Sequence, residues 1–339
     1  MKKRLSLLLA ALTLLLAACG TAAPAPTTQT TASTTVETTT QAPSMRLTLA
    51  CSQTEDSLLG RGAVAFCQEL ATRSGEQLTC TLLPGGSLGT DEQVIPMLQG
   101  GKCDLSLLPA ASLTQLCPEL EVLGLPFLFE SDREARELLG GEAGTLLAER
   151  LASSGLLTLG WMTTGFRQVT ANRAINTPAD FQGLAIRTQP DELHRALFQA
   201  LGATPTLVLE EELLEALEQG AVDGQEDTYL NISAKELSQV QSHVMETNHV
   251  LELALLVISD AQFQNLSQEQ RTWLQEAAAQ AENTQWAAAM EENDTAKQDC
   301  IEKGMISITL GRQALVDAAG PVYDQYREQY GKLMSLFNR

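Results

Sequence analysis

Short apolar runs alternate with longer amphipathic stretches along most of the chain. The run Leu47–Cys51 is followed by residues 57–72, in which apolar positions recur at the spacing of one helix face. Two more strand-like runs, 80–83 and 104–108, enclose a helical stretch at 93–98. Because strands alternating with helices are typical of a parallel sheet with crossover helices, this pattern predicts an α/β fold.

The same alternation starts again in the second half of the chain, after apolar runs at 156–161 and 168–171. A pattern that occurs twice favours two similar lobes. The predicted elements of this second set are a strand at 184–188, a helix at 192–201, a strand at 206–209, a helix at 211–219 and a strand at 221–223.

Residues 267–303 have helical composition and contain neither Pro nor Gly. A helix of that length would extend about 50 Å, farther than one lobe. We therefore expect it to support both lobes. An apolar run at 250–259 precedes this helix, a strand at 305–309 follows it, and a helix with three tyrosines ends the chain.

The N-terminal residues resemble a bacterial export signal. Basic residues at 2–4 precede an apolar run that is shorter than the roughly 20 residues needed to span a bilayer. Leu16-Ala17-Ala18-Cys19 resembles a lipobox, whose cysteine takes a diacylglycerol; ordinary Ala-x-Ala cleavage and an uncleaved anchor are the alternatives. We predict a lipoprotein signal peptide over 1–18, lipidation of Cys19 and a Thr-rich disordered tether over 19–44. The protein would then lie on the outer face of the cell membrane or in the periplasm, held by lipid alone.

Composition narrows the possible ligands. The chain has 22 Lys and Arg against 42 Asp and Glu, a net charge of −20, and such a field repels nucleic acid. Aromatic residues make up only 4%, which argues against stacking platforms for bases or sugars. We therefore expect a ligand that is held by polar contacts.

The cysteines give no sign of a metal site. Six follow Cys19, without a C-x-x-C or a Cys/His cluster, so we expect no metal, and nothing in the chain predicts a cofactor. An even number outside the cytoplasm permits disulfides, while buried free thiols that pack as small hydrophobes are the alternative. The six are Cys51, Cys67, Cys80, Cys103, Cys117 and Cys300.

Residues 85–89, Gly-Gly-Ser-Leu-Gly, match the G-x-S-x-G pattern of hydrolases, between a predicted strand and helix. A catalytic triad with Ser87 would need His194, His243 or His249, all of which follow it in the chain. The alternative is a tight turn whose glycines supply positive φ, and so short a pattern arises easily by chance. We favour the turn and keep an exported serine hydrolase as the second hypothesis.

Two arginines have positions that suit a ligand. Arg167 and Arg187 each lie in or beside a strand-like segment near the start of the second lobe. A guanidinium presents a planar fork that pairs bidentately with a carboxylate, and a closed cleft strengthens the contact by excluding water. An ordinary ion pair, on the surface or between lobes, is the alternative for either arginine.

Seven further motifs occur in one order along the chain: LPGGSLG at 83–89, LQG at 98–100, LPFLF at 125–129, GFR at 165–167, PADFQGLAIR at 178–187, LGATP at 201–205 and AVDGQE at 221–226. Together with the lipobox, this ordered set resembles the solute-binding component of the tripartite ATP-independent periplasmic (TRAP) transporters, the family related to the C4-dicarboxylate-binding protein. The resemblance runs from about residue 46 to the C-terminus.

The resemblance implies a two-lobed α/β fold, like that of periplasmic binding proteins, with a hinge and a long helix spanning both lobes. Lobe I would comprise 45–164 plus about 253–292, and lobe II 165–252 plus about 293–339. Such a protein is not an enzyme. It binds a small organic acid between its lobes and delivers this carboxylate to the small and large membrane permease subunits, with no nucleic-acid partner.

The resemblance also implies residue roles. The family's carboxylate clamp is the arginine in the strand after D-x-x-G, here Arg187, and a second arginine, here Arg167, assists. The family's G-Q-E-N reads G-Q-E-D here, so Asp227 replaces an amide that often points at the ligand. An anion there costs affinity for a bound anion unless it is protonated or faces a hydroxyl or amine, which favours a hydroxylated or amino-bearing monoacid. Alternatively, Asp227 caps the next helix and touches no ligand. The other predicted binding residues are Gln225, Leu209 and, in lobe I loops, Ser52, Pro109 and Ser112.

Overall fold

The computed structural model describes residues 44–338, so the predicted signal peptide, Cys19 and all but the last residue of the tether lie outside it. In the described part, ten strands pair into one sheet. They are β1 Met45–Cys51, β2 Leu78–Leu83, β3 Leu105–Pro109, β4 Leu156–Ala171, β5 Ala185–Arg187, β6 Thr204–Thr206, β7 Gly224–Thr228, β8 His243–Glu246, β9 Leu251–Ser259 and β10 Ile306–Thr309.

The helices begin and end mostly within a few residues of the predicted bounds. N-terminal side chains cap several of them, for example Ser57, which accepts a hydrogen bond from the backbone N–H of Gly60. The helices are α1 Leu58–Arg73, α2 Asp91–Gln99, α3 Asp132–Leu139, α4 Glu142–Ala152, α5 Glu192–Ala200, α6 Leu213–Glu218, α7 Tyr229–Ala234, α8 Asp260–Asn265, α9 Gln268–Glu302, α10 Arg312–Ala318 and α11 Gly320–Met334.

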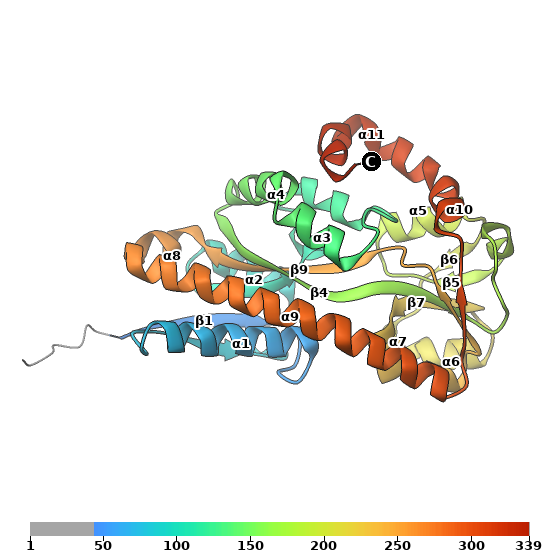
Figure 1. The fold of residues 1–339 in the computed structure, drawn as a ribbon, viewed down its shortest axis with the longest axis horizontal. Coiled ribbons are helices and arrows are strands. Elements are labelled where there is room, and N and C mark those ends of the chain that lie inside the picture. Colours follow the sequence, from blue (N-terminus) through green and yellow to red (C-terminus); the bar gives the residue numbers. More distant parts are fainter. Residues whose placement is uncertain (1–43, 339) are drawn as a thin grey trace, which may run out of the picture. The chain divides into compact units, whose positions relative to one another are not determined.

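The sheet has two halves, joined by β4 and β9 (Figure 1). In one half β2, β1 and β3 are parallel, and β3 lies antiparallel to β9. In the other half β7, β5 and β6 are parallel, and β7 lies antiparallel to β4. The pairing of β4 with β9 runs from Leu156 to Phe166, with two register shifts, and the last five residues of β4 pair with β7. A single strand therefore passes from one half to the other.

The sequence predicted two separate runs where β4 is one strand of 16 residues. Its middle contains Thr163, Thr164 and Gly165, which interrupt the apolar pattern, and the register with β9 shifts there. The polar stretch is stabilised from outside the sheet. Gln285 of α9 accepts from the backbone N–H of Thr163 at 3.1 Å and donates to its carbonyl at 2.6 Å.

Helix α9 runs along both halves, past α1 at one end and α7 at the other (Figure 1). It has 35 residues, and Ser267 begins it with a capping box. Trp286, near its middle, is fully buried, and its indole N–H donates to the carbonyl of Trp161 at 2.8 Å. The predicted brace is therefore confirmed.

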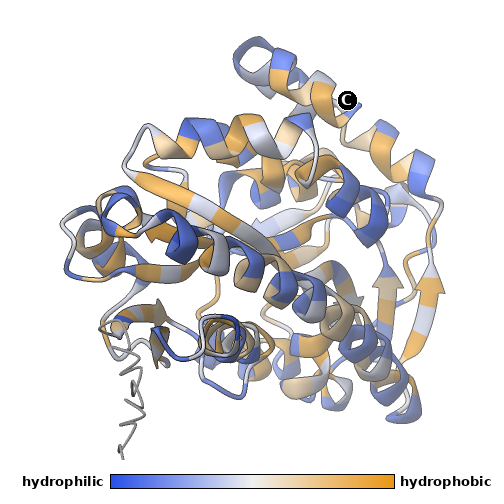
Figure 2. Cartoon of the chain, turned by 60° about the vertical axis from the view of Figure 1, so that its left-hand side comes forward, coloured by the Kyte–Doolittle hydropathy of each residue, from blue (hydrophilic) through white to orange (hydrophobic). Residues whose placement is uncertain are grey.

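Apolar side chains cover both faces of the first half of the sheet. One cluster joins β1, α1 and α9, and a second lies beneath α2, α4 and α11. Figure 2 shows hydrophobic and hydrophilic residues interspersed along the helices that cover the sheet. Two tyrosines of α11 donate to carbonyls of the first half, Tyr323 to Pro126 and Tyr330 to Pro118. Helix α11 also contacts α5, so the C-terminal segment touches both halves.

Two predicted strands lie elsewhere. The run at 206–209 is represented by β6, which ends at Thr206, and the run at 221–223 precedes β7 instead of forming it. All five residues of β7 are buried although four are polar. The apolar pattern misplaced the strand because its side chains are held by charge and hydrogen bonding.

The six cysteines of the described part are free thiols, and four of them are buried. This favours the interpretation as small hydrophobes over disulfides. No helix between residues 44 and 338 has both the length and the apolar character to cross a membrane.

Where β4 passes from one half of the sheet to the other, the structure requires a glycine at position 165. Gly165 has φ +105°, and a Cβ there would lie 2.4 Å from the Asn293 amide nitrogen. We predict that Gly165→Ala lowers the free energy of unfolding by about 2–4 kcal/mol, measured in urea. Gly183→Ala is the matched control, since Gly183 also has positive φ but open space around it, and it should cost about 1 kcal/mol. If both variants lost the same free energy of unfolding, the close approach of Asn293 to Gly165 would not be the cause of the loss.

Candidate ligand-binding site

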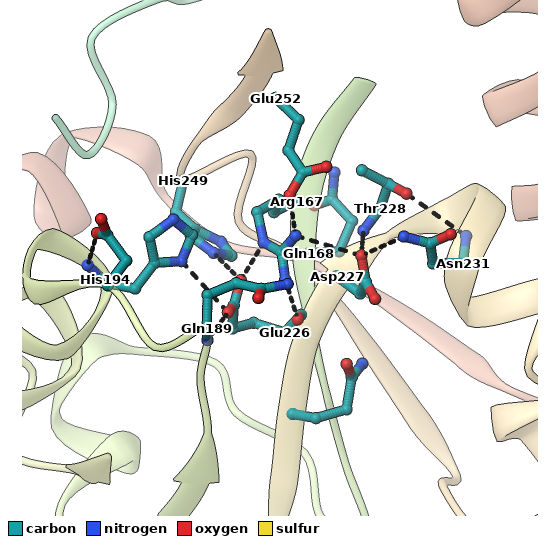
Figure 3. Close-up of polar contacts among 12 residues, drawn as sticks. Arg167, Gln168, Gln189, His194, Glu226, Asp227, Thr228, Asn231, His249 and Glu252 are labelled. Atoms are coloured by element: carbon teal, nitrogen blue, oxygen red, sulfur yellow. Dashed lines mark hydrogen bonds and ion pairs between the residues drawn. The ribbon is translucent and has the colours of Figure 1, made fainter. Parts of the chain in front are cut away.

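Arg167 lies at the point where β4 enters the second half of the sheet, and its side chain is fully buried. Its Nε donates to the Glu226 carboxylate and its Nη1 to the Glu252 carboxylate (Figure 3). Nη1 also lies 3.3 Å from Asp227 Oδ1. Burial lowers the pKa of Arg167, but Glu226 and the other two carboxylates raise it by more. The arginine is therefore charged and engaged by protein groups.

Glu226, on β7, is fully buried as the counter-ion of Arg167. Its Oε1 accepts from the backbone N–H of Gln189 at 3.1 Å and lies 3.3 Å from His194 Nδ1. Its Oε2 lies 3.1 Å from His249 Nε2. Burial raises the pKa of Glu226, but Arg167 and then His194 bring it well below its ordinary value. Since an ionised carboxylate only accepts, both histidines donate to it.

His194, Glu226 and His249 are, within residues 44–338, the one group whose donor atoms could hold a metal ion, all within 4.8 Å of one another. The chemistry around them does not favour a cation, because Arg167 donates to the same carboxylate. Burial lowers the pKa of His249, which is neutral, and Thr247 Oγ1 lies 2.7 Å from its Nδ1. We interpret the group as a hydrogen-bonded support for the Arg167–Glu226 pair.

Asp227 is almost fully buried and fully partnered (Figure 3). Its Oδ1 accepts from the Asn231 amide and from the backbone N–H of Thr228, both at 2.8 Å. Its Oδ2 lies 2.7 Å from Lys235 Nζ. Burial raises the pKa of Asp227, but Arg167 and Lys235 lower it by more, so the carboxylate is ionised.

Lys235 is thus the compensation that sequence reasoning missed. It lies eight residues after Asp227, directly past α7, a spacing that no helix-pair rule singles out in the sequence. The N-cap of α7 is Thr228, whose hydroxyl accepts from the backbone N–H of Asn231, and Asp227 precedes this cap. The changed motif residue is neutralised inside the protein.

Arg187 ends β5 and is buried, yet its guanidinium is only partly satisfied. Nε donates to the Val208 carbonyl at 3.3 Å and Nη2 to Glu210 at 2.8 Å. Nη1 is buried without any hydrogen-bond partner, as is Oε1 of Gln225, the residue paired with Arg187 across β5 and β7. Unpaired polar atoms at buried positions are costly, so these two atoms are suited to ligand groups.

In the first half, two of the predicted residues lie at one carboxylate. Ser112 donates to Asp91 at 3.4 Å. Burial raises the pKa of Asp91, and a hydrogen bond from Ser52 offsets part of this rise. Asp91 starts α2, and the sequence analysis did not single it out. Pro109 ends β3 beside this group, and Leu209 is exposed in the other half. No hydrogen bond or ion pair joins the two groups in the part of the chain that the structure describes.

A cavity of about 220 Å³ lies apart from both groups, lined by Gln168 and Asn248 near the strand crossing and by Asn293 of α9. Gln168 follows Arg167, and successive side chains of a strand point to opposite faces. No predicted binding residue lines this cavity. Tyr229 and Asn293, which line the cavity, also have buried side-chain oxygens without a hydrogen-bond partner. Arg187 differs from both because its unpaired atom belongs to a charged group, whose burial without an acceptor costs more, and we therefore place the candidate site at Arg187.

Ser87 lies in a turn. Gly85, Gly86 and Gly89 have φ of +63°, +66° and +126°, which confirms the tight-turn interpretation. Among the described residues no hydrogen bond joins Ser87 to a histidine: His194 and His249 contact Glu226, and His243 lies against Ser242.

Comparisons with known proteins agree with this geometry. The family "bacterial extracellular solute-binding protein, family 7" matches residues 49–329. The 2,3-diketo-L-gulonate-binding periplasmic protein of Escherichia coli is 31% identical over 86% of this chain and 88% of its own. A TRAP periplasmic solute-binding protein from Ochrobactrum anthropi, with its C-terminus in the ligand-binding pocket, superposes with TM-score 0.84, 31% identity and coverage of 87% and 95%. One from Polaromonas sp. JS666, bound to D-erythronate, gives TM-score 0.75, 28% identity and coverage of 86% and 98%. The predicted two-lobed fold is confirmed.

The buried neutral histidine makes a prediction about pH. In the unfolded chain His249 takes up a proton near its ordinary pKa, whereas the folded protein holds its pKa lower. Because the unfolded state then binds more protons, the free energy of unfolding should fall as pH drops from 7 to 5, by at most about 1.4 kcal/mol per pH unit. Urea unfolding at several pH values should show a flatter dependence for His249→Gln. His243→Gln is the control and should keep the wild-type slope; an unchanged slope in His249→Gln would contradict the prediction.

Proposed function

Because this chain belongs to family 7 of the bacterial extracellular solute-binding proteins, we propose that it binds a small organic acid between its lobes and delivers it to the membrane permease of a TRAP transporter. The permease partner would consist of a small and a large subunit. The proposed lobes are those of the predicted division, 45–164 plus about 253–292 and 165–252 plus about 293–339.

One observation carries the choice of ligand class. The buried Nη1 of Arg187 lacks a partner, on a guanidinium otherwise held by Val208 and Glu210. A charged donor without an acceptor is costly when buried, and a ligand carboxylate supplies the acceptor with the planar geometry that a guanidinium fits best. Arg187 is therefore our proposed clamp. Arg167, whose donors are engaged by protein carboxylates, would act by positioning the strands.

The surroundings favour a hydroxylated monoacid. The related proteins named above bind 2,3-diketo-L-gulonate and D-erythronate, according to their descriptions. Here Gln225 offers an unpaired carbonyl oxygen beside Arg187, and lobe I offers Ser52, Ser112 and the Asp91 carboxylate. All of these groups can pair with ligand hydroxyls, while the Asp91 carboxylate and the Gln225 carbonyl oxygen disfavour a second carboxylate. Gln225, Pro109 and Leu209 would complete the walls of the site.

We place the protein outside the cytoplasm, anchored through a diacylglycerol on Cys19, and we propose that it has no catalytic activity. The alternative of a serine hydrolase gains nothing from the related proteins, which are solute-binding proteins. Ser87 also has no histidine partner among residues 44–338.

The clamp is tested by ligand-induced stabilisation of residues 45–339. An acid present at about a thousand times its dissociation constant adds about 4 kcal/mol, a readily measured rise in Tm. We predict such a rise with at least one acid among D-erythronate, D-galactonate, pantoate and succinate, and its loss in Arg187→Ala, because a buried charge pair disappears. Arg195→Ala, which removes an exposed arginine paired only with Glu192, is the control. A normal rise in Arg187→Ala would remove Arg187 from the site.

Lipidation is tested separately. The full-length protein expressed in bacteria should partition into the detergent phase of a cloud-point extraction, and Cys19→Ser should move it to the aqueous phase, because the acyl chains are lost. Thr28→Ala, in the predicted tether, is the control. Detergent partitioning of Cys19→Ser would overturn the anchor.

A further inference from the structure

A carboxylate of the protein itself, that of Glu210, contacts the proposed clamp Arg187. Glu210 Oε2 accepts from Arg187 Nη2 at 2.8 Å, while its Oε1 contacts Lys235 Nζ. The Glu210 side chain is 52% exposed, whereas that of Arg187 is 5% exposed. A solvent-exposed carboxylate therefore reaches inward to a buried arginine and can leave again at little cost in hydration.

Glu210 belongs to a row of alternating charges. Arg187 pairs with Glu210, Glu210 with Lys235, and Lys235 with the buried Asp227. Each inner member thus has two partners of opposite sign. If Glu210 leaves Arg187, its other oxygen still has Lys235, so the carboxylate remains close to the clamp.

A bidentate carboxylate needs two N–H groups of one guanidinium. Arg187 has Nη1 free but Nη2 occupied by Glu210, and Nε is held by the Val208 carbonyl. Each terminal nitrogen carries two N–H groups, so a ligand carboxylate on Nη1 and Nη2 would share Nη2 with Glu210. The two carboxylates would then lie side by side and repel each other, which drives Glu210 from Arg187 towards Lys235.

We propose that Glu210 is a specificity-determining residue of this site. It competes with the ligand carboxylate for Arg187, and after displacement it stays on Lys235 as a negative acceptor beside the ligand. This inference rests on the proposed function. The ligand it selects is an acid with a hydrogen-bond donor next to its carboxylate, as in a 2-hydroxy acid, because a donor is attracted by Glu210 while a second carboxylate is repelled.

The test compares Glu210→Gln with Glu211→Gln, which removes the same charge from the neighbouring, solvent-exposed residue. Both are titrated by calorimetry with D-erythronate, a 2-hydroxy acid, and with succinate, a dicarboxylate without a hydroxyl. Glu210→Gln should raise affinity for succinate about tenfold and for D-erythronate about threefold or less. The preference for D-erythronate over succinate, expressed as the ratio of the two affinities, should therefore decrease. Glu211→Gln should leave both within about twofold of wild type. An unchanged ratio in Glu210→Gln overturns the proposal.

Lys235 is tested by a double-mutant cycle. Lys235→Met should weaken binding in the wild-type background, because displaced Glu210 loses its alternative partner, and weaken it less in the Glu210→Gln background. If Lys235 acted only by neutralising Asp227, the loss would be equal in both backgrounds, and that result would overturn its part in the proposal. Circular dichroism of each variant without ligand reports whether the fold is kept.

The outcomes separate this inference from the function on which it rests. If wild type binds an acid and Glu210→Gln behaves like Glu211→Gln, the inference fails and the function stands. If Glu210→Gln binds an acid that wild type does not, the internal competitor is supported directly. If none of these proteins binds any acid of the panel, the proposed function fails and the inference fails with it.

Discussion

The buried ion pair between Arg167 and Glu226 is the interaction on which the second lobe depends. It joins β4 to β7 at the point where β4 stops pairing with β9. Two ions without exposed surface lose several kcal/mol of hydration each, and their attraction offsets that loss only if their remaining atoms are also satisfied. The neighbouring carboxylates complete the guanidinium, and two histidines with a backbone N–H complete Glu226. Removing one partner would leave an uncompensated charge in the core of the lobe.

The same network decides which arginine remains for a ligand. Arg167 has the more conspicuous cluster around it, but its donors are taken by the protein. Arg187, two strands away, keeps one buried nitrogen unpaired and holds only a half-exposed glutamate on another. The Arg167–Glu226 pair therefore holds the strands together, and we propose Arg187 as the ligand clamp because only its guanidinium has a buried nitrogen left to bond an acid.

Sequence reasoning predicted most of the architecture because hydrophobic burial dominates it. The strands of the first half and α1 follow from apolar spacing, and α9 follows from a long stretch of helical composition without Pro or Gly, with Ser267 as its N-cap. Prediction failed at β7 and in the middle of β4. Both carry polar residues at buried positions, and a pattern based on hydropathy has no means of assigning such residues to a strand.

For the proposed site, the sequence supplied the candidate chemical groups: two arginines by resemblance to a family, the aspartate in the changed motif, and the serines of lobe I. It also raised the question of how an aspartate could be tolerated beside a bound anion. Only the tertiary structure answered it, by placing Lys235 against Asp227 and Glu210 against Arg187. The reason is physical. The pKa of a charged side chain, and whether its donors and acceptors find partners, are set by groups within a few ångströms. Which residues those are depends on how the strands and helices pack.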